Sequence, residues 1–348
     1  MNKTLARLTL ALFISCALLQ HNLPVASSQQ EADPNFDAKV ARPAYTAKHP
    51  KVLFDEAHFN FHTSAGRYKP FADLITSDGY TITPNKEKFQ KKTLKGYKIL
   101  VIANALGAER QNSPEADSPA FTEEECDVVR EWVRAGGSLL LIADHAPFGA
   151  AAETLAKRFG VDMSKGHTMD VNNYDQEDEN KNRTFLVFSR DNKLLIDHAI
   201  TRGRDATEHI NRIITFTGQS LKGPEGSVAF LKLSETAQDR QPPSKDSKPI
   251  TLDRLPNGQP LPPGVTVQGR PAGPAVSAAG RAQGIAMAFG KGRVVVLGEA
   301  AMLSAQLVTG SVAQLAGKDE IRIGMNRSGI DNRQLALNIM HWLSGLLR

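Results

Sequence analysis

Short apolar runs alternate with amphipathic segments along residues 51–160 of this 348-residue chain. The runs at 51–55 (KVLFD), 80–84, 94–105 and 138–143 predict strands, and the longest of them are continuously apolar, as in strands covered on both faces. Segments 68–79, 122–137 and 151–160 carry apolar residues at helical spacing and end at glycine. This order predicts a doubly wound, mostly parallel α/β sheet with helices on both faces.

The segment 122–137 gives the strongest helix prediction. Thr122 and Glu125 have the spacing of a capping box, in which each side chain hydrogen-bonds to the backbone of the other residue. The apolar residues that follow share one helical face: Cys126, Val129, Trp132 and Val133. This pattern indicates that Cys126 is a core residue rather than a nucleophile.

The second half of the chain is less regular. Strands are predicted at 184–188, 210–217 and 227–233, and a hairpin at 284–298 around GKG. Residues 234–283 hold nine of the nineteen prolines and predict an extended surface excursion without regular elements. The terminal segment predicts a helix with Asp331 as its N-cap and His341 packed inside, and its sheet-facing residues are Leu335, Ile339, Trp342 and Leu346.

The first 27 residues have the order of a secretory signal peptide. Lys3 and Arg7 precede an apolar stretch too short for a permanent membrane span, and small residues follow at 25–27. We expect cleavage near Ala26 to Ser28 and a periplasmic or secreted protein, in preference to lipid attachment at Cys16. Residues 28–50 are then expected to be a flexible tail and residues 51–348 a single domain.

Charge argues against a nucleic-acid partner. The formal charge is +5, and loss of Lys3 and Arg7 with the signal peptide would leave +3. No basic stripe with interleaved aromatic residues appears, so nucleic-acid binding is not expected. A small polar or saccharide ligand is the expected partner.

Acidic and imidazole side chains follow three of the apolar runs. Asp55 and His58 come after the first run, Asp144 and His145 after the run at 138–143, and Glu299 after the run at 293–298. Ligands in open parallel sheets bind at the carboxyl ends of the strands, where these residues would meet. Each residue alone is common in turns and caps, but together they predict a site.

Two chemistries suit such a site. Asp55, His58 and His145 could hold a divalent, zinc-like metal that activates water, with Glu299 as the base. Without a metal, Asp144 or Glu299 would share acid–base work with a histidine such as His145. Four further residues are candidate ligand contacts: Glu56, His62, His167 and Arg202. Of these, His167 lies in a polar loop at 165–183 that predicts a solvated flap.

Several stretches together resemble a bacterial family of unknown function within the class I glutamine amidotransferase-like superfamily. They are KVLFDEAH (51–58), GGSLLLIADHAPFG (136–149), IDHAITRG (196–203), ITFTGQSL (214–221) and GKGRVVVLGEAAML (290–303). The resemblance covers about residues 50–345 and implies a flavodoxin-like α/β sandwich. Amidotransferases of this class carry a cysteine in the turn after a central strand and a His and Glu after a later one. Here the turn at 144–149 has no cysteine and Glu299 has no adjacent histidine, so that glutaminase triad is excluded.

The leading hypothesis is an exported hydrolase acting on a polar saccharide or ester, with Asp144, His145 and Glu299 as catalytic residues. The alternative is a non-catalytic carbohydrate- or ligand-binding module, in which Phe59, Phe61 or Tyr174 would stack on a sugar. A third possibility is a degenerate enzyme fold that serves as a structural partner.

Overall fold

The computed structural model describes residues 29–178, 181–244, 246–248, 250–252, 267–269, 271, 273–310 and 319–348. Within these residues the main sheet has nine strands, in the order β3-β2-β4-β5-β17-β16-β10-β6, with β11 also paired to β16. The strands β2 (Lys51–Asp55), β3 (Thr81–Asn85), β4 (Ile99–Ala103), β5 (Ser138–Ile142) and β17 (Gly292–Leu297) run parallel. The protein is therefore a mixed α/β fold with a large, mostly parallel central sheet.

The other strands of this sheet are antiparallel. β16 (Ala282–Phe289) pairs with β17 through the predicted hairpin, and it also pairs with β10 (Leu221–Lys222) and β11 (Val228–Lys232). β6 (Asp162–Met163) then pairs with β10. The parallel part of the sheet thus ends at β17, because its neighbour β16 runs antiparallel to it.

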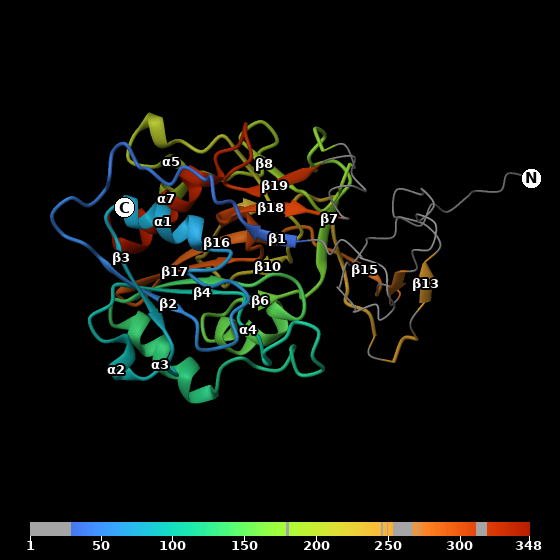
Figure 1. Ribbon diagram of the computed structural model, residues 1–348, viewed down its shortest axis with the longest axis horizontal. Helices are drawn as coiled ribbons and strands as arrows, with labels where there is room; N and C mark the ends of the chain where they lie inside the picture. Colours follow the sequence, from blue (N-terminus) through green and yellow to red (C-terminus); the bar gives the residue numbers. More distant parts are fainter. Residues whose placement is uncertain are drawn as a thin grey trace, which may run out of the picture.

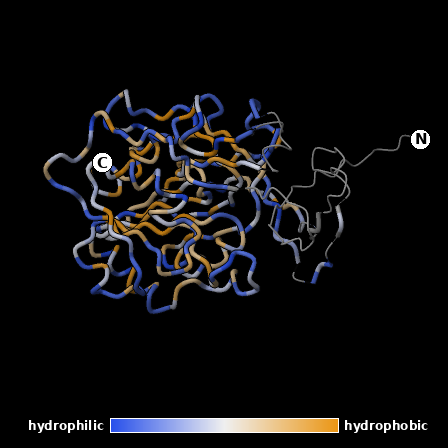
Figure 2. The backbone as a smooth tube through the Cα atoms, viewed as in Figure 1, coloured by the Kyte–Doolittle hydropathy of each residue, from blue (hydrophilic) through white to orange (hydrophobic). Residues whose placement is uncertain are grey.

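Helices cover both faces of the sheet (Figure 1). α1 (Lys69–Ser77) and α7 (Asn332–Ser344) contact each other on one face, and α3 (Glu123–Arg134) lies on the other between α2 (Lys91–Leu94) and α4 (Phe148–Lys157). Alternate residues of each central strand enter opposite cores: Val101 faces the α1–α7 side, whereas Leu100 and Ile102 face the α3 side. This two-sided burial explains the continuously apolar strands, and Figure 2 shows the hydrophobic positions gathered along the sheet.

The helix predictions from capping and amphipathic pattern are confirmed. Thr122 accepts a hydrogen bond from the backbone N–H of Glu125 at 3.2 Å, and the Glu125 carboxylate accepts one from the Thr122 N–H at 3.1 Å. Cys126 is fully buried in the core beneath α3. His341 is buried in α7, where its Nε2 contacts the Asp78 carboxylate at 2.7 Å.

At α7 one prediction is confirmed in position only, and a second was wrong. Asp331 occupies the N-cap position, but its carboxylate accepts the N–H groups of Asn211 and Arg212 and makes no cap hydrogen bond. Leu346 is 40% exposed and does not face the sheet. The reason is Gly345, whose φ of 92° ends the helix and turns Leu346 outward.

The segment expected to be a loose tail contains regular structure. β1 (Gln29–Ala32) pairs with β18 (Ala305–Thr309), which also pairs with β19 (Glu320–Gly324). Phe36, Val40 and Tyr45 pack against the α1–α7 core. These apolar residues therefore anchor the segment, although their irregular spacing predicts neither a helix nor a strand. The predicted signal peptide lies outside the described residues.

The stretch 234–283 was expected to contain no regular element, and this was wrong for its described part. β12 (Ala237–Arg240) pairs with both β15 (Ala275–Ser277) and β7 (His167–Asp170), and β13 (Ile250–Leu252) pairs with β14 (Val267–Gly269). Other short strands are β8 (Val187–Ser189) and β9 (Arg212–Ile214), which pair with each other; α5 (Ala199–Arg202) contacts α7. Backbone pairing with distant partners formed strands that the local sequence did not signal. Among the residues that the structure describes, no helix has the length and apolarity needed to cross a membrane.

Candidate functional site

Asp144 and Glu299 meet at the carboxyl edge of the sheet, as the sequence predicted. They follow β5 and β17, which are neighbouring parallel strands. The Ala300 N–H, next to Glu299, donates a hydrogen bond to Asp144 Oδ1 at 2.7 Å. Glu299 is almost completely buried, whereas Asp144 keeps partial exposure to solvent. Asp144 is therefore the more accessible of the two acidic residues, although its carboxylate is held inside the structure.

Asn104, at the end of β4, holds Asp144 from the other side. Its Nδ2 donates to Asp144 Oδ2 at 2.7 Å, and its Oδ1 accepts the Asp144 N–H at 2.9 Å. Asn104 was not among the predicted site residues. Its position directly after an apolar run is the same signal that identified Asp144, so applying that rule to β4 would have found it.

The pKa values of both carboxyl groups are raised. Burial raises the pKa of Glu299 to about 8, and the nearby Asp144 charge adds to this, although the backbone N–H groups of Met302 and Ala301 act in the opposite direction. Burial also raises the pKa of Asp144 to about 6, against the hydrogen bonds from Asn104 and Ala300. The pair therefore retains a proton near neutral pH.

Gln219 fixes the backbone turn that carries Asp144, and it was also missed. Its Nε2 donates to the carbonyl oxygens of Ala143 and Asp144, both at 2.9 Å, and its Oε1 accepts the Lys165 N–H at 2.7 Å. Next to Gln219, the backbone at Gly218 lies close to Gly298: a Cβ on Gly218 would be 2.3 Å from the Gly298 carbonyl oxygen. Only glycine allows residues 218 and 298 to touch in this way.

His145 and His167 lie face to face with ring centroids 3.6 Å apart. His145 Nδ1 is 2.7 Å from the Ala146 carbonyl oxygen, which can only accept, so Nδ1 carries the proton and Nε2 the lone pair of the neutral ring. Burial lowers the pKa of His145 to about 4 and that of His167 well below its usual value. His167 belongs to the buried strand β7, so the predicted solvated flap at 165–183 was wrong at this position.

His62 is buried beside Tyr68. The two rings have centroids 4.8 Å apart, and the Tyr68 hydroxyl donates to the Ala300 carbonyl oxygen at 2.6 Å. His62 is buried with no hydrogen-bond partner at Nδ1, and burial, aided by the Arg67 charge, lowers its pKa to about 3. His62 is therefore a neutral ring next to the residues that hold Asp144.

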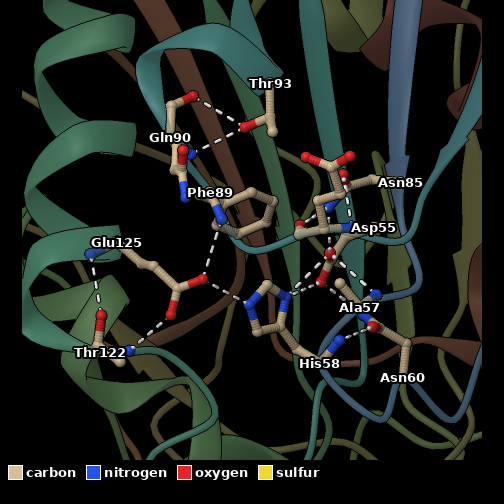
Figure 3. A network of polar contacts seen from close by, with 11 residues as sticks. Asp55, Ala57, His58, Asn60, Asn85, Phe89, Gln90, Thr93, Thr122 and Glu125 are labelled. Carbon is tan, nitrogen blue, oxygen red and sulfur yellow. Dashed lines mark hydrogen bonds and ion pairs between the residues drawn. The ribbon is translucent and has the colours of Figure 1, made fainter.

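Asp55 and His58 belong to a separate buried network (Figure 3). His58 Nδ1 is 2.9 Å from both Asp55 carboxylate oxygens, and its Nε2 is 2.9 Å from Glu125 Oε1. The ring also packs against Phe89 and Phe121, each with its centroid 4.7 Å away, and these two rings stack on each other with centroids 5.8 Å apart. Burial lowers the pKa of His58, but the hydrogen bonds and charges of Asp55 and Glu125 outweigh it and raise the pKa. His58 is thus a buried imidazolium bridging two carboxylates.

The proposed metal ligands do not fit a metal ion. Both ring nitrogens of His58 are occupied by carboxylates, and His145 is stacked on His167 in the turn after β5. Across the described ranges, no three His, Cys, Asp or Glu side chains are grouped so as to hold a metal ion. Asp55, His58 and His145 were therefore not brought together, and we derive no step through a metal.

Two other candidate contacts make ion pairs of their own. Glu56 accepts from the Ser64 N–H and hydroxyl and pairs with Lys86 at 2.6 Å, so it ties together the loops after β2 and β3. Arg202 is exposed at the end of α5, where it pairs with Asp197. These contacts hold neither Glu56 nor Arg202 against Asp144.

Comparison with known proteins informs the fold. No protein-family model and no curated protein sequence matches the chain. The mmIFT52 N-terminal domain matches 85% of this chain over 97% of its own length, with 13% identity and a TM-score of 0.53. The likeness is one of fold.

Two weaker structural matches have glutamine amidotransferase-like folds. They are a ThuA-like protein from Bacteroides uniformis ATCC 8492 (15% identity, 87% of this chain, 95% of that chain, TM-score 0.37) and a protein described as part of a GMP synthase from Thermoplasma acidophilum (9%, 86%, 97%, 0.39). TM-scores this low fix neither the fold nor the chemistry of this chain.

Backbone strain gathers around the site. Among the described residues, six that are not glycine have positive φ, and four of these lie in the segments just described: Phe59, Asn104, Lys165 and Thr217. Thr217, with φ of 79°, is β-branched and especially disfavoured there. Such strain persists only where surrounding contacts enforce it, and it concentrates at functional sites. This clustering supports the carboxyl edge near Asp144 as the candidate site.

Proposed function

We propose that this chain is an exported hydrolase that acts on a polar saccharide or ester through acid–base chemistry at Asp144. The observation that carries the proposal is the placement of two acidic side chains, Asp144 and Glu299, side by side after the neighbouring strands β5 and β17, where the Ala300 N–H links them. Burial in this arrangement raises the pKa of both carboxyl groups. A general base works best when its pKa lies near the working pH. Asp144, partly exposed and with a pKa of about 6, meets that requirement.

The proposed step moves one proton from water to the leaving group. Asp144 takes a proton from water, the water oxygen forms the new bond to the substrate, and the bond to the leaving group breaks. With an ester, Asp144 returns this proton to the leaving-group oxygen; with a glycoside, water attacks from the face opposite the leaving group, so the protonated Glu299 supplies the proton and Asp144 keeps the one from water. Glu299, protonated beneath it, keeps the local negative charge low, and the neutral His145 orients the substrate by hydrogen bonding.

The fold is proposed to be the flavodoxin-like, amidotransferase-like sandwich. Numbered along the chain, the five parallel strands lie in the order 2-1-3-4-5, which supports this assignment. In that arrangement the ligand site is expected outside the carboxyl ends of the strands, where Asp144 and Glu299 lie. Cleavage of the segment 1–27 on export belongs to the same proposal, as does a single domain, which includes the anchored segment 29–50.

A binding module is the second candidate. Both oxygens of Asp144 and both oxygens of Glu299 already accept hydrogen bonds from within the chain. Such rigidly held carboxylates suit recognition of sugar hydroxyls as well as they suit catalysis. The two candidates differ in whether any bond is broken.

A reciprocal exchange of two side chains tests the hydrolase. Asp144→Asn removes the base but leaves its amide facing that of Asn104, whereas Asp144→Asn with Asn104→Asp keeps a complementary hydrogen-bonded pair and moves the carboxylate. On p-nitrophenyl esters and glycosides, we expect turnover to fall by about 10²-fold or more in both variants.

The exchange variant should recover the thermal stability of the wild type while staying inactive. Turnover retained in a folded Asp144→Asn protein would contradict the role of Asp144. Absence of turnover in the wild type, with saturable binding of a glycoside, would favour the binding module.

A further inference from the structure

Phe59 combines two unfavourable features. The residue is 53% exposed, the largest value among the exposed large hydrophobic residues that the structure describes. Its backbone has φ of 47°, a left-handed conformation that is costly for a bulky residue. Neither cost is offset by burial of the ring, so folding alone gives no reason for a phenylalanine here.

The residues on either side of Phe59 hold it in this conformation. The His58 N–H donates to Asn60 Oδ1 at 3.1 Å, and Asn60 Nδ2 donates to Asp55 Oδ2 at 3.0 Å (Figure 3). The His58 ring is itself anchored between Asp55 and Glu125. The buried charged network thus serves as the support that presents the Phe59 ring outward.

The same loop is joined to the candidate site. The His58 carbonyl accepts the Leu106 N–H at 3.0 Å, and the Phe61 N–H donates to the Asn104 carbonyl at 2.9 Å. Asn104 in turn hydrogen-bonds to Asp144. Phe61 packs inward against Phe148, with centroids 5.4 Å apart, so Phe59 is the ring of this loop that faces solvent.

We propose that Phe59 is a stacking platform for a pyranose ring of the substrate of the Asp144 site, which makes that substrate a saccharide rather than a simple ester. The proposal rests on the proposed function for the location of the site. A pyranose has an apolar C–H face that stacks on an aromatic ring, and hydroxyls at its edge that suit carboxylates and amides such as Asp144 and Asn104. Because the backbone of Phe59 is already held in place, only the two torsions of its side chain lose conformational entropy on binding.

Binding can be measured separately from turnover. Saturation-transfer NMR and calorimetry would compare the wild type with Phe59→Ala, Phe59→Trp and Phe59→Gly. The probes are methyl glycosides of glucose, galactose, mannose, xylose and N-acetylglucosamine and their β-1,4-linked disaccharides. We expect at least one saccharide to bind, with about tenfold or greater loss in the alanine and glycine variants and retention in Phe59→Trp.

Stability readings separate a lost platform from a lost fold. Glycine suits φ of 47°, so Phe59→Gly should be at least as stable as Phe59→Ala while binding equally poorly. Leu346→Ala is the matched control, because Leu346 is also exposed but follows α7, whose last turn contacts Ser138 at the amino end of β5. The Leu346→Ala variant should bind the saccharides as tightly as the wild type does.

Each outcome decides one of the two proposals. Saccharide binding that is equal in Phe59→Ala and the wild type, or no saccharide binding by the wild type, overturns the platform. If Phe59-dependent binding is found without hydrolysis of any bound saccharide, the platform stands and the hydrolase falls. If ester hydrolysis needs Asp144 but not Phe59, the hydrolase stands and the platform falls.

Discussion

At the scale of single residues, the site is defined by what each side chain hydrogen-bonds to. Asp144, His145 and Glu299 were found from the sequence because they follow apolar runs directly. Glu125 was predicted only as a capping residue, yet the same carboxylate also binds the His58 ring. Local spacing reveals the cap, but the second contact joins residues 67 positions apart and leaves no local pattern.

Replacing Glu299 tests the raised pKa. A folded-state pKa of about 8, above the usual value of 4.5, means that the native state holds this proton more tightly than the unfolded chain. The resulting stability is fully present below pH 4.5 and is lost as pH rises through about 8. Glu299→Gln removes this titration, so we expect the wild type to lose on the order of a few kcal/mol relative to the variant between pH 5 and 9.

Urea unfolding across that pH range provides the measurement. Glu225→Gln, at an exposed position, is the matched control and should run parallel to the wild type. A constant difference between Glu299→Gln and the wild type over the whole range would refute the raised pKa.

His58 gives a second test at this scale. His58→Gln leaves the buried Asp55 and Glu125 carboxylates without their shared cation, so the free energy of unfolding should fall by about 3–5 kcal/mol. Because the folded-state pKa of His58 is raised, its contribution is complete below pH 6.5 and is lost as pH rises through the folded-state value. The difference between wild type and variant, from urea unfolding, should therefore shrink as pH rises above 6.5.

A double variant provides the control for His58. Adding Glu125→Gln to His58→Gln removes one stranded carboxylate and should recover part of the lost stability. A double variant less stable than His58→Gln would argue against the ionic network as the source of the effect.

At the scale of elements, connections between strand ends position the site. The capping box placed α3 correctly, and the glycine stops ended the helices close to where they were predicted. The strand β12 and the edge strand β1 were not predicted, because both form by pairing with segments far away in the chain. The residues 218–219, which meet the end of β17, were likewise visible only once the strands were assembled.

Gly218 tests this close approach. A Cβ there would lie 2.3 Å from the Gly298 carbonyl oxygen and 2.6 Å from Glu299 Cβ. Gly218→Ala should therefore destabilise the protein by about 1–3 kcal/mol and displace Glu299. Thermal unfolding monitors the first effect, and the pH dependence of stability monitors the second. Gly226→Ala is the control, because a Cβ on Gly226 would have no atom within 4 Å, although its φ of 82° carries some strain. Equal losses of stability in the two variants would contradict a steric cause.

At the scale of the whole molecule, two cores lie on opposite faces of the sheet, each covered by helices (Figure 1). The carboxyl edge of the sheet gathers residues 55, 85, 104, 144 and 299. Parallel strands bring their ends to one edge whatever their separation in the chain. The sheet sorts these residues into two groups: Asp55 and Asn85 join the His58 network, whereas Asn104 and Asp144 join Glu299. This division separates a structural cluster from the candidate reactive one.

The sequence alone determined the alternation of strands and helices, because burial on one or both faces of an element leaves a periodic trace in the residues themselves. It also located Asp144 and Glu299 at one edge. Only the tertiary structure decided that His58 bridges two carboxylates, that His145 stacks on His167, and that Asn104 and Gln219 hold the Asp144 turn. These contacts depend on the order and register of strands, which are set by packing between distant segments and leave no periodic signal.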